Sequence, residues 1–283
     1  MKFRQLYKEI KKKLQPITDG YASEAAMLME FVTGRSFADI TFSSDDEVSE
    51  KTAAELDALI EKRGKGYPIQ YILGKWSFMD RDYIIGEGVL IPRDDTEVVV
   101  REVLKRAKSI SSPRIYDLCS GSGIIAVTLA AELDKSNVTA IELSKTAFEY
   151  LKENVRLNNV QNVTALNKDI LKCYGDVEDK CIDILVANPP YIETDRIPKL
   201  QRELQSEPMM ALCGGDDGLY FYREILKYWT PKIKQGGVAA FEIGETQAEE
   251  ITLMMQKLMY TDIRVIKDIQ GLDRAVSGVC NMR

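Results

Sequence analysis

The chain has 283 residues, 45% of them hydrophobic and 29% charged, which is enough for one large domain or two with a filled core. Acidic residues outnumber basic ones by 44 to 38, and this balance argues against a protein that grips duplex DNA along many phosphates. Histidine is absent, so Ser-His-Asp and Cys-His nucleophile systems and histidine metal ligands are excluded, and we expect no metal site.

No apolar run approaches the roughly 18 residues that cross a bilayer, and the N-terminal stretch lacks the apolar core of a secretory signal. The five cysteines are odd in number, scattered and never spaced as Cys-x-x-Cys, which favours reduced thiols over disulfides or a zinc site. We therefore expect a cytoplasmic protein that does not bind membranes, and nothing in the sequence demands more than a monomer.

Residues 1–75 are predicted to form a small helical bundle, because apolar residues recur at helical spacing in three stretches. These stretches are 3–14, 22–33 and 49–63, and glycine follows each of the last two. The functional interpretation of this bundle is a domain that docks a substrate.

The chain changes character between Pro68 and Pro92. Tyr71 to Leu73, and then the apolar residues from Trp76 to Ile85, alternate with glycine and aspartate, which suggests short strands or a hairpin. We assign residues 76–92 to a β-hairpin-like connector between two domains.

Residues 93–283 are predicted to form an α/β domain that opens with a helix over 94–108 and then alternates strand and helix. Strands are expected at 114–118, 138–143, 163–166, 182–187 and 237–243, with helices at 124–133, 144–158, 219–233 and 246–259. Two late strands, 262–267 and 275–281, are joined by a connection short enough for an antiparallel pair. Repeated βα units predict a mostly parallel, Rossmann-like sheet with helices on both faces.

A glycine turn, Asp117-Leu-Cys-Ser-Gly-Ser-Gly123, joins the first of these strands to a helix. Gly121 and Gly123 permit close approach of a ligand at a strand's carboxyl end and a helix's N-terminus, where open α/β sheets bind ligands. Cys119 and Ala126 occupy the first and third glycine positions of a dinucleotide fingerprint. The turn alone therefore indicates a nucleotide-like ligand without identifying it.

Acidic residues follow the next two strands. Glu142 stands about 20 positions after the glycine turn and suits two ribose hydroxyls, the alternatives being a helix-capping acid or a solvated strand end. Asp169 is placed to accept from an adenine amino group while Ile170 packs on the ring. The alternative is a loop acid beside a core isoleucine, and the sequence does not separate the two.

The sequence Asn188-Pro-Pro-Tyr191 directly follows the wholly apolar stretch 182–187. Two prolines fix the backbone, so the Asn188 side-chain oxygen and the Pro189 carbonyl can both accept from one planar NH₂ group. Tyr191 offers a face for stacking a flat amide or base. Positioning and electrostatics then favour methylation of a conjugated nitrogen without a histidine base. The alternative is an ordinary Asn-Pro-Pro turn.

With these residues identified, the chain resembles the release-factor glutamine methyltransferases, the PrmC/HemK family, over nearly its whole length. The most specific segment is Gly88-Val-Leu-Ile-Pro-Arg-Asp-Asp-Thr-Glu97. The other similar segments are Asp117–Gly123, Asn188–Tyr191, Gly214-Gly-Asp-Asp-Gly218, and Phe241-Glu-Ile-Gly244 followed by Gln247.

The resemblance implies a class I S-adenosylmethionine-dependent methyltransferase domain with an antiparallel C-terminal strand, preceded by a helical domain. It implies methyl transfer to the side-chain amide nitrogen of the glutamine in the Gly-Gly-Gln motif of class 1 peptide-chain release factors. The catalytic and substrate-binding residues are expected among Asn188, Pro189, Pro190, Tyr191 and Arg93. The cofactor-binding residues are expected to be Asp117, Cys119, Ser120, Gly121, Ser122, Gly123, Glu142, Asp169, Ile170 and Asn188.

Two departures from the family pattern concern the cofactor. Cys119 stands where many relatives carry glycine, and Glu142 stands where aspartate is commoner. Arg93 has alternative roles: it would hold a cofactor carboxylate, shape the substrate entrance, or form a salt bridge between domains with a nearby acid.

Three other functions compete with this interpretation. An adenine-N6 DNA or RNA methyltransferase shares the Asn-Pro-Pro-Tyr motif, but it must extrude its base, and this acidic chain is not expected to bind nucleic acid stably. An NAD-dependent oxidoreductase is suggested by fold class alone, and the poor glycine fingerprint of this chain argues against it. A non-enzymatic binding module would not need the intact motif at 188–191.

Overall fold

The computed structural model describes residues 1–282, which form two compact units. The first unit comprises Met1–Lys75 together with Arg202–Ser206. The second comprises Trp76–Gln201 and the chain from Glu207 onward. Over the described part of the chain, every helix is too short or too polar to span a bilayer.

The first unit is a helical bundle, as predicted. Its apolar core is drawn mainly from the faces of α1, α2 and α4, because buried residues such as Leu6, Ile10 and Leu14 recur at helical spacing. Serine caps begin two of the helices, at Ser36 and Ser49. The helices are α1 (Phe3–Leu14), α2 (Tyr21–Thr33), α3 (Phe37–Phe42), α4 (Glu50–Gly64) and α5 (Ile69–Leu73).

A buried arginine holds the distant segment Arg202–Ser206 within this unit. The side chain of Arg63 donates to Glu24 Oε2 over 2.7 Å and also contacts Glu203 Oε1 at 2.7 Å. Because a buried guanidinium needs charged partners, Arg63 accounts for the grouping of Glu203 with the bundle.

The prediction of strand or hairpin structure at Tyr71–Leu73 is wrong, because these residues belong to helix α5. Pro68 stands at its N-cap and Gly74 ends it in the left-handed conformation. An apolar run this short carries no clear period, so its sequence did not distinguish helix from strand. The hairpin itself follows as β1 (Lys75–Phe78) and β2 (Arg81–Ile84), and its turn residues Met79 and Asp80 both have positive φ.

The second unit is built on a seven-stranded sheet in which β9 runs antiparallel to the other described strands. In sheet order the strands are β5 (Val163–Asn167), β4 (Asn137–Glu142), β3 (Arg114–Leu118), β6 (Ile182–Ala187), β7 (Ile233–Glu242), β9 (Asp273–Cys280) and β8 (Tyr260–Lys267). The predicted α/β class, with a mostly parallel sheet and an antiparallel C-terminal strand, is confirmed. Strand β7 starts earlier than predicted because Pro231 follows α11 and ends its helical course.

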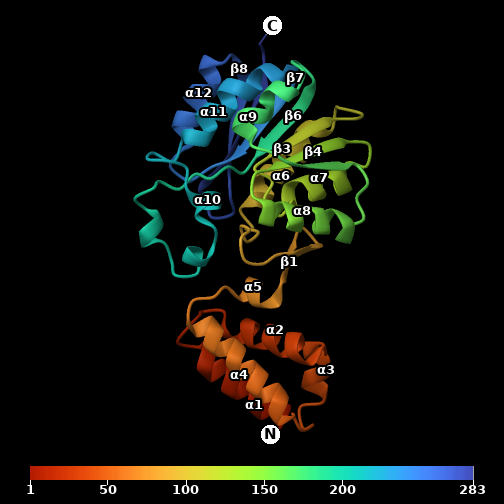
Figure 1. The fold of residues 1–283 in the computed structure, drawn as a ribbon, viewed down its shortest axis with the longest axis vertical. Helices are drawn as coiled ribbons and strands as arrows, with labels where there is room; N and C mark the ends of the chain where they lie inside the picture. The colour runs from red at the N-terminus through yellow and green to blue at the C-terminus, as the bar shows by residue number, and fades with distance from the viewer. Residues whose placement is uncertain (283) are drawn as a thin grey trace. The chain divides into compact units, whose positions relative to one another are not determined.

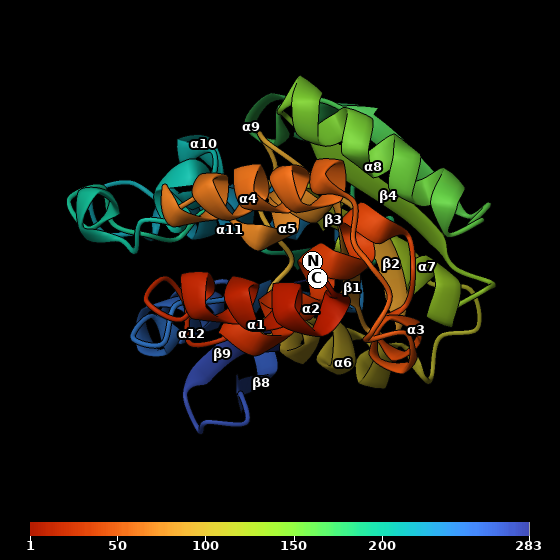
Figure 2. The same ribbon diagram turned by 90° about the horizontal axis from the view of Figure 1, so that it is seen from below.

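Helices cover both faces of this sheet, as the two views in Figures 1 and 2 show. One layer contains α6 (Thr96–Ala107), α7 (Ile124–Glu132) and α8 (Lys145–Leu157). The other contains α9 (Ile170–Cys173), α11 (Tyr220–Trp229) and α12 (Ala248–Lys257). Between β6 and α11 the chain also forms the short helix α10 (Met209–Leu212).

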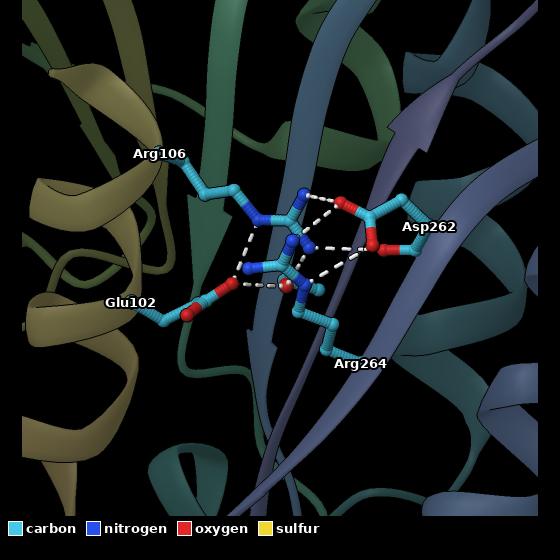
Figure 3. Close-up of polar contacts among 5 residues, drawn as sticks. Glu102, Arg106, Asp262 and Arg264 are labelled. Atoms are coloured by element: carbon cyan, nitrogen blue, oxygen red, sulfur yellow. Dashed lines mark hydrogen bonds and ion pairs between the residues drawn. The ribbon is translucent and has the colours of Figure 1, made fainter.

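A polar network joins α6 to the two C-terminal strands (Figure 3). Arg106 donates to Glu102 Oε1 at 2.7 Å, to Asp262 Oδ2 at 2.5 Å and to Ser277 Oγ at 3.0 Å. The Ser277 hydroxyl in turn donates to Glu102 Oε1, and Arg264 pairs with Asp262. Each buried charge in the network therefore has a partner, which is the condition for burying charge at modest cost. We call these five residues the α6 network.

Candidate active site

Strand register brings four candidate side chains into one row at the carboxyl edge of the sheet. Leu118 pairs with Ile141 and with Ala187, and Ala187 pairs with Phe241. One residue further along, the row therefore reads Glu142, Cys119, Asn188, Glu242. A cavity of about 350 Å³ opens within the second unit at this edge, and the first three of these residues line it.

The glycine turn forms one wall of the cavity. Cys119, Ser120, Gly121 and Ser122 line it, whereas Gly123 lies outside the lining and caps the N-terminus of α7. Backbone N–H groups of such a turn, together with a helix N-terminus, suit a ligand that carries acceptor atoms. Cys119 adopts the left-handed conformation with φ of 60°, the region that usually selects glycine.

Asp117 lies beneath the turn and does not line the cavity. Its Oδ2 accepts from the Ala126 N–H at 3.1 Å and fixes the first turn of α7, while Oδ1 has no partner among the described residues. Complete burial raises the pKa of this carboxyl group to about 8. The structure thus places Asp117 as a support for the turn.

Glu142 lines the cavity and also braces the turn. Its two oxygens accept from the Gly121 N–H at 2.8 Å and from the Ser144 N–H at 2.6 Å, and its burial raises its pKa. Each carboxylate oxygen keeps a further lone pair, so ribose hydroxyls would find two acceptors here.

The predicted adenine-side residues lie together. Asp169 and Ile170 both line the cavity, and Asp169 Oδ1 accepts from the Leu171 N–H as the N-cap of α9. Ile170 is 5% exposed, so it presents an apolar surface on a rigid support. Ile170 also belongs to the apolar core, so the alternative of an acid beside a core isoleucine is present at this wall of the cavity as well.

The diproline motif leaves β6 with Asn188 and Pro190 on the cavity wall, while Pro189 and Tyr191 are outside the lining. The Asn188 Nδ2 group donates to Thr96 Oγ1 at 3.4 Å, which leaves Oδ1 as the acceptor available to a ligand. The Tyr191 hydroxyl donates to Glu242 Oε1 at 3.4 Å, and burial raises the pKa of this tyrosine.

The motif at 214–218 packs directly on the backbone of the diproline motif. A Cβ atom at Gly214 would lie 2.7 Å from the Pro190 oxygen, and one at Gly218 would lie 2.3 Å from the Tyr191 oxygen. Glycine is therefore required by close backbone approach. The Gln247 amide adds a clamp, because it donates to the Tyr191 carbonyl at 3.1 Å.

Arg93 lines the cavity and forms an ion pair with Glu207, whose side chain is 1% exposed. Glu207 also accepts from the Ile91 N–H at 3.0 Å. The salt-bridge alternative for Arg93 is therefore present, but with a distant residue of the same unit. This pair attaches the chain before α10 to the segment before α6.

Sequence reasoning did not identify Thr96, Glu242, Glu207 or Asn154 as parts of the site. Asn154, on α8, donates to the Ser122 carbonyl at 2.9 Å and so supports the glycine turn. Glu242 was open to detection, because an acid that directly follows the buried apolar run 238–241 is unusual unless it serves a site.

Comparison with known proteins gives the family. The family model for the PrmC N-terminal domain matches residues 5–74, and that for the methyltransferase small domain matches residues 94–212. A release factor glutamine methyltransferase of Thermodesulfovibrio yellowstonii is 39% identical over 83% of this chain and 84% of its own length. One of Clostridium botulinum is 36% identical over 90% of this chain and 91% of its own.

The chain belongs to the release factor glutamine methyltransferase family. Among solved structures, PH0851 matches with a TM-score of 0.50 and 15% sequence identity, over 68% of this chain and 47% of that one, which bears on the fold alone. The class I methyltransferase fold predicted from sequence is confirmed by the sheet order and the matched methyltransferase domain.

The cavity fits S-adenosylmethionine, the cofactor of this family of methyltransferases. The Ser120 and Gly121 N–H groups already donate to the Ile141 carbonyl and to Glu142 Oε2, so the methionine end of the cofactor would meet the Ser122 N–H and the N-terminus of α7. Glu142 would offer two acceptors to a ribose. Ile170 and Leu171 provide an apolar wall for a purine. The donor and acceptor groups present therefore match each part of the cofactor.

Proposed function

We propose that this chain methylates the side-chain amide nitrogen of the glutamine in the Gly-Gly-Gln motif of class 1 peptide-chain release factors. The observation that carries the proposal is the orientation of Asn188. Its NH₂ group is engaged by Thr96, so its oxygen is the acceptor available at the wall of the cofactor cavity. The names of the curated relatives support the substrate.

An amide nitrogen is a poor nucleophile because its lone pair is delocalised into the carbonyl group. Asn188 Oδ1 at the cavity wall would accept one N–H of the glutamine amide, and the carbonyl of Pro189, a residue outside the cavity lining, would accept the other. The two acceptors would hold the group in plane and raise electron density on nitrogen. S-Adenosylmethionine, when bound, supplies an electrophilic methyl group on a sulfonium centre. The nitrogen lone pair would form the new N–C bond as the S–CH₃ bond of the sulfonium breaks and a neutral thioether leaves. The amide would then release one proton to water, so no histidine base is needed.

We also propose a role for the first unit and a cellular setting. Residues 1–75 would dock the release factor, and the match of residues 5–74 to a family-specific N-terminal domain supports this role. The protein would act in the cytoplasm, where release factors work, as a monomer and without stable binding to nucleic acid.

Mass spectrometry of a release factor incubated with the protein and S-adenosylmethionine tests the proposal. We expect one added methyl group on the Gly-Gly-Gln glutamine, and none on a release factor in which that glutamine is alanine. An adenine-containing DNA oligonucleotide serves as the competing acceptor. Methylation of the oligonucleotide in place of the release factor would overturn the proposed substrate.

A further inference from the structure

Glu242 is a buried carboxylate that the proposed reaction does not yet use. It ends strand β7 beside the first residue of the diproline motif, and it is 1% exposed. Its Oε2 atom has no hydrogen-bond partner among the described residues. A buried, under-satisfied carboxylate is costly, so its presence at this point calls for a functional reason.

The hydroxyl groups next to Glu242 act as donors to it. The Tyr191 hydroxyl donates to Oε1 at 3.4 Å, and the Thr96 hydroxyl lies close enough to the carboxylate to lower its pKa. Thr96 is fully buried at the start of α6, where its oxygen also accepts from Asn188 Nδ2. The resulting chain of donors runs from Asn188 to Thr96 to Glu242.

This chain of donors decides which end of the Asn188 amide faces the substrate. A hydroxyl carries one proton, so when Thr96 directs its proton to the carboxylate, the Thr96 oxygen accepts from an N–H, as it does from Asn188 Nδ2. Asn188 can supply that N–H only by turning its NH₂ group toward Thr96. Its oxygen is then left as an acceptor for an NH₂ group, which is what an amide nucleophile requires.

We propose that Glu242 is a positioning residue for the diproline motif. Through Thr96 it fixes the Asn188 amide with its oxygen toward the substrate. Through the Tyr191 hydroxyl it holds the other end of the motif. The proposal rests on the proposed methylation of a primary amide. Without the carboxylate, the Thr96 proton is free to turn to Asn188 Oδ1 and occupy the acceptor that the substrate needs.

The ionised form of Glu242 is the form that orders the donors, so activity should depend on its titration. Burial and the negative charge of Asp95 raise the pKa of Glu242 to about 7, although Thr96, Arg274 and Tyr191 act to lower it. From α11, the Tyr222 hydroxyl donates to the Glu242 main-chain carbonyl. We expect kcat to fall as the pH drops through about 7, because protonated Glu242 is a weaker acceptor.

Two isosteric variants and one matched control test the proposal in the full-length protein. Glu242→Gln presents an NH₂ group to Thr96 and reverses the donor chain, and Thr96→Val removes its middle member. Glu102→Gln changes a buried carboxylate of the α6 network, away from the cavity (Figure 3). We expect kcat to fall about 100-fold in Glu242→Gln and about 10-fold in Thr96→Val, with KM for the release factor and Kd for S-adenosylmethionine within about 2-fold.

The pH profile and the Asn188 side-chain amide signals separate positioning from a general structural role. Glu242→Gln should lose the acidic limb of the kcat profile, and Glu102→Gln should keep it. In ¹H–¹⁵N spectra of the free protein, the Asn188 amide pair, assigned by its loss in Asn188→Asp, should shift in Glu242→Gln and Thr96→Val but not in Glu102→Gln.

Several outcomes would overturn the inference. They are an unchanged kcat or unchanged acidic limb in Glu242→Gln, Asn188 amide signals that stay in place, or a loss of cofactor affinity that matches the loss of kcat. The spectra need no substrate, so they test the positioning even if the wild-type protein fails to methylate a release factor. That failure would count against the proposed function alone.

Discussion

Two sets of buried polar groups in the second unit differ in how fully they are paired. In the α6 network, Glu102 and Arg106 face one another, and Asp262 and Ser277 complete their hydrogen bonds. At the carboxyl edge of the sheet, Asp117 and Glu242 each keep one buried oxygen without a partner among residues 1–282. The first set lies away from the cavity, and the second lies at the strand ends that surround it.

This difference in pairing indicates where buried polar groups lower the stability of the fold and serve its chemistry. The fully paired α6 network connects α6 to the C-terminal strands, and its hydrogen bonds are complete without a ligand. Under-satisfied carboxylates raise the energy of the folded state, and they are retained where they orient groups that must act on a ligand. We therefore expect substitutions in the α6 network to lower mainly stability, and substitutions at the carboxyl edge of the sheet to lower mainly activity.

The largest effect is expected from Asn188→Ala, which removes the acceptor at the cavity. We expect kcat to fall by about 10²- to 10³-fold, comparable with the loss of one preorganised polar group that stabilises a transition state. Affinity for S-adenosylmethionine should stay within about 3-fold, as measured by calorimetry, because the glycine turn and Glu142 remain. Full activity in this variant would contradict a chemical role for the polar groups at the carboxyl edge of the sheet.

Glu102→Ala should show the opposite behaviour. It leaves the buried Arg106 guanidinium with only the half-exposed carboxylate of Asp262, and breaking a buried ion pair costs about 3 kcal/mol or more of unfolding free energy. Urea denaturation measures the loss, while kcat at a temperature where the variant is folded should match that of the wild type. A large fall in kcat in the fully folded variant would show that the α6 network also contributes to the active site.

Asp117→Asn sharpens the comparison through its dependence on pH. Burial raises the folded-state pKa of Asp117 to about 8, whereas the unfolded chain ionises near pH 4. The folded state therefore holds a proton that the unfolded state has lost, and the contribution of Asp117 to stability falls as the pH rises from about 4 to about 8.

The asparagine variant cannot ionise, so its melting temperature relative to wild type should rise over this interval. A difference of one pH unit between the folded-state and unfolded-state pKa corresponds to about 1.4 kcal/mol of stability, which thermal denaturation at pH 5 and pH 8.5 resolves. Equal differences at the two pH values would contradict an uncharged, buried Asp117.

The smallest effect is expected from Cys119→Gly. Cys119 has a φ of 60°, which is strained for a residue with a Cβ atom, and glycine relieves the strain while increasing the freedom of the unfolded chain. We expect a net stabilisation of up to about 1 kcal/mol in denaturant unfolding. Destabilisation of that size would mean that the packing of the Cys119 side chain against the core outweighs the backbone strain.

Elements with local signals were predictable from the order of residues alone. The apolar run Ile182–Ala187 and the strand Arg114–Leu118 have the bounds that were predicted from it, because side-chain periodicity and turn residues act over a few positions. The same local signals identified the glycine turn and the diproline motif. They were weakest at Tyr71–Leu73, where one helical turn and a short strand have the same composition.

Which side chains lie next to one another depends on contacts between distant parts of the chain. The order of strands β4, β3, β6 and β7 aligns Glu142, Cys119, Asn188 and Glu242 in one row, and that order depends on pairings between residues far apart in the chain. In the same way, Arg63 joins the segment 202–206 to the helical bundle through Glu203. No periodicity in a sequence encodes such contacts, because they form only when packing chooses one register and one partner from many.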